Sequence, residues 1–229
     1  MWKKILLYFY ILFPFYVFYS YSTSNHSFKS FQKKECEVID GSKICIAHYN
    51  NEAFYYLLDT NQNVRFIADK LVRPYCIGKN NYHDCLIDRT FYFLTLQKYK
   101  PYDDKKTMTE LLVQDGLDCG DRVNLMSSIL HYLKIDDYYY ILLPHHMAIL
   151  VRYKDIHRFK DYIGAYIKGK KYIFIETTSK KPIIKKDPFS YQYLLGDGLV
   201  GSFSRNDVKF LFNPVRKEYA DPNEIRWGY

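Results

Sequence analysis

Low-complexity stretches and internal repeats are missing from this 229-residue sequence, apart from one repeated cysteine spacing. Glycine and proline are scarce, at 10 and 8 residues, and no run of either marks a flexible linker. These absences argue against a repeat architecture and against two domains joined by a linker. The residues after the first 24 suffice for one sizeable hydrophobic core, so we expect a single compact unit.

A clear signal-peptide cleavage site is also missing. Lys3 and Lys4 precede an apolar and aromatic run over residues 5–19 that only Pro14 interrupts. A positive start followed by such a run is typical of an export signal. The run is short for a spanning helix, which needs about 20 residues, although the following residues extend it. Residues 1–24 are therefore predicted to be a signal peptide or an N-terminal membrane anchor, with the remaining chain exported and either secreted or held at the membrane.

No nucleic-acid-binding motif accompanies the basic composition. The formal net charge is +8, and it is +6 without residues 1–24, since only Lys3 and Lys4 are lost. Export of the chain argues against a nucleic-acid partner. A basic surface would instead favour an anionic partner such as lipid head groups or an acidic envelope polymer. A plain solvated face is the simpler alternative. The basic residues in question are Lys168, Lys170, Lys171, Lys180, Lys181, Lys185 and Lys186.

Four of the five cysteines form two pairs with the same spacing. Asp40-Gly41 is a strong two-residue hairpin turn, and counting outward from it places Cys36 opposite Cys45. Cross-strand partners at a non-hydrogen-bonded position are close enough for a disulfide. Cys76 and Cys85 would close a second loop. Four cysteines allow three connectivities, of which this is the preferred one, and disulfides favour an exported protein.

A zinc site is an alternative for the second pair. Cys76, His83 and Cys85 all have side chains that bind zinc. A structural zinc site needs a fourth ligand, and none is evident nearby. The disulfide is therefore the preferred prediction.

The fifth cysteine, Cys119, lies where a helix should begin. Apolar residues recur every three or four positions over residues 119–134, which predicts an amphipathic helix. Asp118 is suited to cap that helix, and Asp121 three residues later fits an acidic capping box. A helix N-terminus and a neighbouring imidazolium both favour the thiolate form of a cysteine. The alternatives are a small buried thiol that only packs, or a third disulfide partner.

Candidates for a base and an acid follow along the chain. Residues 139–153 are rich in β-forming side chains, and His146 begins a stretch that reads as a buried strand. If His146 faces the helix, alternation puts Ala148 and Leu150 on that same face. His145 is the weaker choice, because it lies beside Pro144. Glu176 ends another predicted strand, where it could orient an imidazole as the third member of a triad.

These segments resemble the transglutaminase-like cysteine enzymes of the papain-like superfamily. The sequence Gly-Leu-Asp-Cys-Gly-Asp at residues 116–121 is similar to the Gly-Asp-Cys-x-Asp block of that family, and residues 146–151 and 172–178 resemble its histidine and acid strands. Residues 107–112 resemble its short lead-in helix. The resemblance spans residues 87–200, and it implies Cys119 as nucleophile, His146 as general base, Glu176 as orienting acid and no cofactor or metal.

Two departures from the family pattern concern the cysteine block. Leu117 intervenes where many members have glycine directly before Asp-Cys, and Gly120 replaces a common acidic or polar residue. Neither change removes a catalytic group. The side chain that stabilises the oxyanion is not evident from the sequence; Gln114 is one candidate, and the amide of Cys119 is the safer donor.

The sequence therefore predicts an α+β fold with an antiparallel sheet packed against the helix that starts at Cys119. An N-terminal extension at residues 25–85 joins the transglutaminase-like domain at residues 86–229. A helix is expected over residues 86–98, a short strand over residues 208–212 and an irregular C-terminus. The expected activity is acyl transfer from a peptide or glutamine-type amide through a thioester, with hydrolysis preferred over amine transfer. A catalytically inactive binding or scaffolding module at the cell surface is the alternative.

Overall fold

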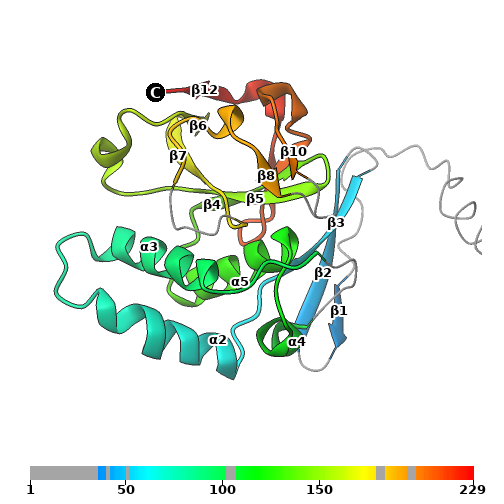
Figure 1. Ribbon diagram of the computed structural model, residues 1–229, viewed down its shortest axis with the longest axis vertical. Coiled ribbons are helices and arrows are strands. Elements are labelled where there is room, and N and C mark those ends of the chain that lie inside the picture. The colour runs from blue at the N-terminus through cyan, green and yellow to red at the C-terminus, as the bar shows by residue number, and fades with distance from the viewer. Residues whose placement is uncertain (1–35, 40–41, 50–51, 102–106, 179–183, 195–199) are drawn as a thin grey trace, which may run out of the picture.

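The protein is described by a computed structural model that covers residues 36–39, 42–49, 52–101, 107–178, 184–194 and 200–229. It is an α+β fold in which helices lie on one side of a curled antiparallel sheet (Figure 1). The predicted signal or anchor at residues 1–24 and the Asp40-Gly41 turn lie outside the described residues. Within the described residues, no helix is both long and apolar enough to span a membrane.

The main sheet has seven strands in the order β11-β10-β4-β5-β7-β6-β12, and every pairing in it is antiparallel. Its centre is the hairpin of β4 and β5, whose strands are rich in tyrosine, isoleucine and leucine, as expected of buried strands. The strands are β4 (Tyr138–Leu143), β5 (His146–Val151), β6 (Gly164–Ile167), β7 (Lys170–Ile175), β10 (Phe210–Asn213), β11 (Glu218–Ala220) and β12 (Arg226–Gly228). A separate two-stranded sheet pairs β8 (Tyr193–Leu194) with β9 (Val200–Gly201).

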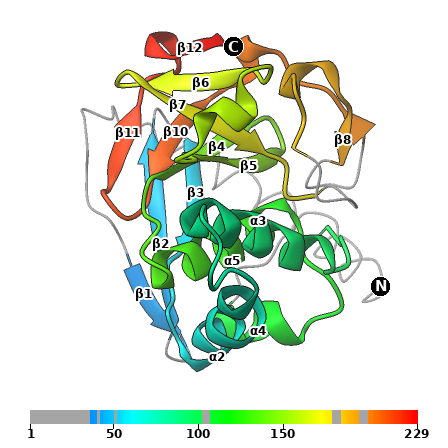
Figure 2. The same ribbon diagram turned by 90° about the vertical axis from the view of Figure 1, so that its left-hand side faces the viewer.

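The helices form a layer below the main sheet in Figure 1, and the turned view in Figure 2 shows the same separation. The layer consists of α2 (Gln62–Phe66), α3 (Tyr82–Thr95), α4 (Met108–Val113) and α5 (Cys119–Tyr132), with a π-helical segment, Ile67–Val72, after α2. Short 3-10 turns occur at Arg73–Tyr75, Ile156–Phe159, Pro188–Ser190, Arg205–Asp207 and Pro222–Glu224. The helix at α5 is as predicted, and α3 begins at Tyr82 and ends at Thr95, slightly earlier than expected.

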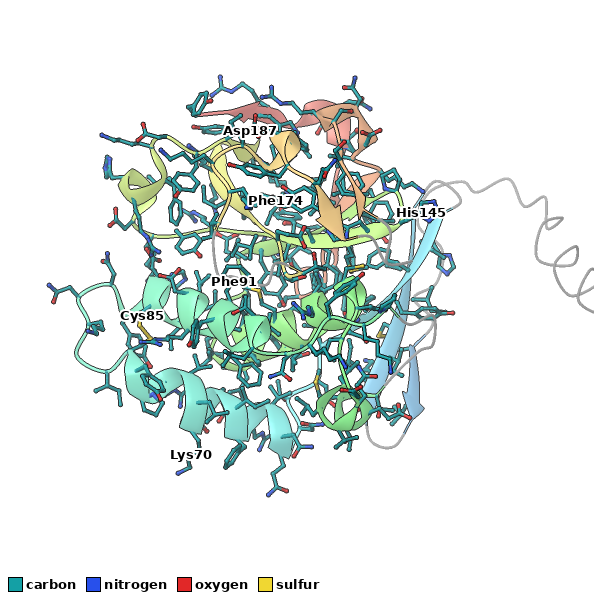
Figure 3. The ribbon with its side chains drawn as sticks, in the orientation of Figure 1. Lys70, Cys85, Phe91, His145, Phe174 and Asp187 are labelled. Carbon is teal, nitrogen blue, oxygen red and sulfur yellow. A yellow bond between two sulfur atoms is a disulfide. The ribbon has the colours of Figure 1, made fainter. Side chains whose placement is uncertain are left out.

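The main sheet buries apolar side chains on both faces. One cluster packs β5 against α3 and α5, and it includes Phe91 of α3. The other lies on the opposite face and includes Phe174 of β7; both phenylalanines are labelled in Figure 3. Burial on both faces explains why β4 and β5 read as continuous apolar runs rather than as alternating ones.

The N-terminal extension packs on the cysteine helix. Its strands β1 (Cys36–Ile39), β2 (Ser42–Tyr49) and β3 (Glu52–Leu57) form an antiparallel sheet. The amide of Leu57 donates to Asn124 Oδ1 of α5 at 3.0 Å, and Ser128 Oγ of α5 donates back to the Leu57 carbonyl at 3.1 Å. The extension therefore braces α5, and its Phe54 also packs against Tyr140 of β4 and Phe210 of β10 in the main sheet.

Both predicted disulfides are confirmed. Cys36 pairs with Cys45 across β1 and β2 in the predicted register, and Cys76 pairs with Cys85. The second disulfide is visible beside the Cys85 label, near the start of α3 (Figure 3). This disulfide uses Cys76 and Cys85, so neither thiol is available as a zinc ligand. Two disulfides indicate an oxidising, extracytoplasmic setting for the chain.

One expectation is wrong. The C-terminus is not irregular, because β11 and β12 add one strand at each edge of the main sheet. Three lysines of the expected basic surface have partners: Lys168 lies 2.8 Å from Glu218, Lys170 lies 3.8 Å from Asp137, and Lys171 donates to a backbone carbonyl. Lys180 and Lys181 lie outside the described residues.

Candidate active site

The start of α5 is fixed by the predicted capping box. Asp118 Oδ1 accepts from the amide of Asp121 at 2.7 Å, and Asp121 Oδ2 accepts from the amide of Asp118 at 3.4 Å. Cys119 is the first helical residue, at the positive end of the helix dipole. Its own amide lies in the first turn, outside the intrahelical hydrogen-bond ladder, so it remains directed out of the helix end. Cys119 is a free thiol and 7% exposed, which contradicts a third disulfide.

Gly116 lets a neighbouring segment approach this turn. Its φ is +122°, which few other residues adopt, and a Cβ there would lie 2.8 Å from Cβ of Lys100. The amide of Leu117 donates to the Lys98 carbonyl at 2.8 Å, and the amide of Lys100 donates to the Leu117 carbonyl at 3.1 Å. We call residues 97–100 the strap. The glycine of the cysteine block thus has a local structural cause, which is the close passage of the strap.

The histidine comes from the first residue of β5. A two-residue turn, Pro144-His145, joins β4 to β5, and His145 has a φ of +53° in that turn. His145, which is labelled in Figure 3, therefore lies in the turn. His146 is the first residue of β5 and pairs with Leu143 of β4. His146 is buried, and the structure therefore agrees with the choice of His146 over His145 as the inward-facing histidine.

The acid follows directly after β7 and contacts this histidine. His146 Nε2 donates to Glu176 Oε2 at 2.7 Å. The other carboxylate oxygen, Oε1, accepts from the amide of Thr178 at 2.7 Å and from its hydroxyl at 2.6 Å. The side chains of His146 and Glu176 are 0% and 2% exposed. Both oxygens of the carboxylate are therefore engaged, and the imidazole plane is held by a rigid partner.

His146 and Glu176 each stabilise the charged form of the other. Burial alone would lower the pKa of His146, but the charge of Glu176 and hydrogen bonds to Cys119 and Glu176 raise that pKa to about 10. Burial alone would raise the pKa of Glu176, but the charge of His146 and hydrogen bonds from His146 and Thr178 lower it. The imidazole therefore holds a proton strongly while the carboxylate stays ionised.

Cys119 interacts with the free side of the imidazole. It contributes to the raised pKa of His146 through a hydrogen bond and through its charge. Since Glu176 takes Nε2, the nitrogen that remains for the sulfur is Nδ1. Nδ1 is buried and has no hydrogen bond of good geometry within the described residues, so the thiol lies beside it without a well-formed hydrogen bond. The structure thus brings together all three predicted site residues, with His146 between the thiol and the carboxylate.

The predicted facing of β5 is wrong, although the side chains alternate along the strand as expected. Met147 and Ile149 pack in the cluster that contains α5, whereas Ala148 and Leu150 belong to the cluster on the opposite face of the sheet. His146 lies at the end of the strand. From that end its ring can interact with Cys119 at the helix start without facing the body of α5.

Two aromatic rings cover the imidazole. The rings of Tyr193 and Phe203 lie nearly parallel to that of His146, with centroids 6.0 and 5.4 Å away. The Tyr193 hydroxyl donates to the carbonyl of Pro188, which fixes the first ring. The sequence did not point to either aromatic residue, because residues 191–203 contain three glycines and are typical of turns. They exclude water from the imidazole and the carboxylate.

Arg122 is a further unexpected residue of this site. It lies one turn after Cys119 and is 1% exposed. Its guanidinium donates to the Thr177 carbonyl at 2.6 Å and to the Gln97 carbonyl at 2.5 Å, and it lies 5.7 Å from the ring centroid of Tyr99. The sequence carried one signal for it: a spacing of three from Cys119 places it on the same side of the helix.

The suggested oxyanion residue has a different partner. Gln114 Nε2 donates to Asp121 Oδ2 at 3.1 Å, so the amide supports the cap of α5. That leaves the backbone amide of Cys119 as the oxyanion donor expected from the sequence. Among the described residues, no group of three or more histidine, cysteine, aspartate or glutamate side chains is arranged to hold a metal ion.

Comparisons with known proteins provide no relative for this chain. No model of a protein family matches it, and neither the curated proteins nor the solved structures contain a match.

Proposed function

We propose that this chain is a cysteine-dependent acyl-transfer enzyme of the transglutaminase-like, papain-like type. The observation that carries the proposal is the buried chain of groups from Glu176 through His146 to Cys119, at the start of α5. A carboxylate that holds one ring nitrogen leaves the other to exchange a proton with a thiol, which is the arrangement that nucleophilic catalysis by cysteine requires. The substrate class is a peptide or glutamine-type amide.

The first half of the reaction forms a thioester. Because the pKa of His146 is raised to about 10, the proton of the Cys119 thiol already lies on Nδ1 of His146 in the resting site, and the thiolate sulfur attacks the carbonyl carbon of the amide to form a C–S bond. The amide of Cys119 donates to the resulting oxyanion. When the tetrahedral species collapses, the C–N bond breaks and the imidazolium gives its proton to the leaving amine.

The second half returns the enzyme to its starting state. His146 accepts a proton from water as the water oxygen attacks the thioester carbon. Collapse breaks the C–S bond, releases a carboxylic acid and leaves the thiolate beside the imidazolium. An amine in place of water would give a new amide, but no described feature of the chain favours an amine, so hydrolysis is the proposed outcome.

The proposed setting is outside the cytoplasm, where the two disulfides are stable. A protein or peptide is the proposed substrate partner. Membrane attachment through residues 1–24 and contact with an anionic surface remain proposals, since the first lies outside the described residues and part of the expected basic surface is engaged with acids.

Alkylation of the folded chain tests the proposal. At pH 6.5 an ordinary thiol is only about 1% thiolate, so an activated Cys119 should react with iodoacetamide far faster than the same thiol in the urea-unfolded chain. Mass spectrometry after digestion identifies the modified residue. Equal rates in the folded and unfolded chain would refute the activated nucleophile, and a Cys119→Ser variant gives the background rate.

A second candidate function is an inactive binding module. The observation in its favour is burial: the imidazole and carboxylate are sealed under Tyr193 and Phe203, and Cys119 is only 7% exposed. In a module of this kind the three groups only stabilise the fold. A Cys119→Ala chain that fully replaced the wild-type chain in cells would favour this function over the enzyme.

A further inference from the structure

Arg122 is a buried cation whose hydrogen bonds go to backbone carbonyls. Burying a positive charge is costly unless its surroundings compensate for the lost water. The two carbonyls, of Thr177 and Gln97, compensate only in part, since among the described residues no carboxylate is hydrogen-bonded to the guanidinium. The position of this charge, one helical turn from Cys119, therefore calls for an explanation.

The explanation lies in the charges around it. Burial lowers the pKa of Arg122, while the charges of Glu176, Asp118 and Cys119 act in the opposite direction. These groups reach the guanidinium from the end of β7 and from the start of α5. Arg122 is thus a positive charge placed among the acidic groups of the candidate site.

The electrostatic problem at Cys119 is an excess of negative charge. Glu176 must be ionised to orient His146, and the N-cap Asp118 adds a second carboxylate near the thiol. A like charge nearby disfavours a further ionisation, so both carboxylates oppose the thiolate. The imidazolium of His146 offsets one of these charges but not both.

The remaining groups around Cys119 do not supply the missing positive charge. Asp121 is acidic and accepts from Gln114 and from the backbone. Tyr99 and Tyr193 are phenols whose pKa values burial raises, so they stay neutral. Besides His146, Arg122 is a basic side chain whose charge interacts with those of Cys119 and Glu176.

The same guanidinium connects three segments of the site. Thr177 directly follows Glu176, Gln97 begins the strap that pairs with Leu117, and Arg122 itself lies in the first turns of α5. Its planar fork can hold two carbonyls at once, which a lysine cannot reproduce. Charge and position can therefore be separated by substitution.

We propose that Arg122 is a positioning residue that acts as the counter-charge of the site, so that Cys119 and Glu176 are negative at the same time. This inference rests on the proposed function. Arg122 does not touch the reacting atoms; it acts through the thiolate and through the carboxylate that orients His146.

The pH profile of Cys119 alkylation by iodoacetamide, measured on the full exported chain, tests this role. In Arg122→Gln, which loses the charge but keeps an amide donor, the half-maximal pH should rise by about one unit. Alkylation on the rising limb would then be about tenfold slower than in the wild type.

Arg122→Lys keeps the charge and loses the fork, so its profile should stay at the wild-type pH while hydrolysis slows. Arg158→Gln, on the surface beside Asp88, is the matched control and should change neither.

The outcomes separate the two proposals. If the wild-type thiol is not activated, the proposed function fails and Arg122 has no role to play. If the wild type is activated and a folded Arg122→Gln chain has the same profile, only the counter-charge inference is overturned. Should Arg122→Gln fail to fold, as judged by circular dichroism, Arg122→Lys decides: an unshifted profile supports the counter-charge, and a tenfold slower rising limb overturns it.

Discussion

The two ends of α5 carry the same pair of chemical groups in different surroundings. At its start, His146 and Glu176 are 2.7 Å apart beside Cys119; in its last turn, His131 and Asp136 are also 2.7 Å apart. The first pair is 0% and 2% exposed, and the second is 30% and 38% exposed. Distance alone therefore does not distinguish a candidate catalytic pair from a surface ion pair.

Burial and a third group make the difference. Water screens the pair at His131, and no thiol faces its ring, so it contributes no more than a surface pair does. At His146, the covering rings exclude water and the sulfur gives the second nitrogen a proton partner. Matched substitutions in the two pairs therefore distinguish an effect on the reactivity of Cys119 from an effect on the stability of α5.

The largest expected difference is in stability. Removing one member of a buried ion pair costs about 3–5 kcal/mol, because a desolvated group is left without its partner. A surface pair contributes about 1 kcal/mol or less. We therefore expect Glu176→Ala to lower the free energy of unfolding by at least about 3 kcal/mol, and Asp136→Ala to lower it by no more than about 1. Urea denaturation at pH 7 measures both, and equal losses would mean that the pair at the helix start is only another ion pair.

Reactivity should show the next largest difference. An ordinary thiol is about 1% ionised at pH 6.5, so losing an activating imidazole slows alkylation by up to about a hundredfold. His146→Ala is expected to bring iodoacetamide modification of Cys119 close to the rate of an unfolded thiol. His131→Ala, at the other end of α5, should leave that rate unchanged. If both variants slowed equally, the cause would be the helix and not the imidazole.

The pH dependence of stability tests the buried pair at the helix start in another way. The folded pKa of His146 is raised to about 10 from its usual 6.5. Its stabilising contribution is therefore complete below pH 6.5 and is lost as the pH rises toward 10. Glu176, whose pKa is lowered, loses its contribution only in acid. We expect the unfolding free energy of the wild type to fall between pH 6.5 and 10 more steeply than that of His146→Phe. A His146→Phe curve parallel to that of the wild type would count against the buried imidazolium.

The sequence was sufficient for the parts of the site that depend on local chemistry. The Asp118 cap, the start of α5 at Cys119 and the register of Cys36 with Cys45 all follow from residues within a few positions of one another. Capping boxes and two-residue hairpin turns are local structures, so their signals survive without knowledge of the fold.

The sequence was not sufficient where distant segments meet. Alternation in β5 separates Met147 from Ala148, but nothing local decides which of two apolar faces meets the helix. The cover over His146 depends on Tyr193 and Phe203, which follow it by more than 40 residues in the chain. Arg122 was visible by its spacing, yet its role depends on carbonyls from two other segments. These features are set by tertiary packing.

The smallest expected effect tests whether the helix start itself matters to Cys119. Among the described residues, two α-helices begin with a capping box, Asp118 with Asp121 at α5 and Thr107 with Glu110 at α4. Replacing either cap by alanine should cost about 1 kcal/mol, since one first-turn amide loses its acceptor. Only Asp118→Ala should also change the alkylation rate of Cys119, because it loosens the turn that carries the thiol. Thermal unfolding and alkylation at pH 6.5 measure the two effects. If Thr107→Ala changed the alkylation rate as much, the thiol would be responding to overall stability and the distinctive chemistry at this end of α5 would need another cause.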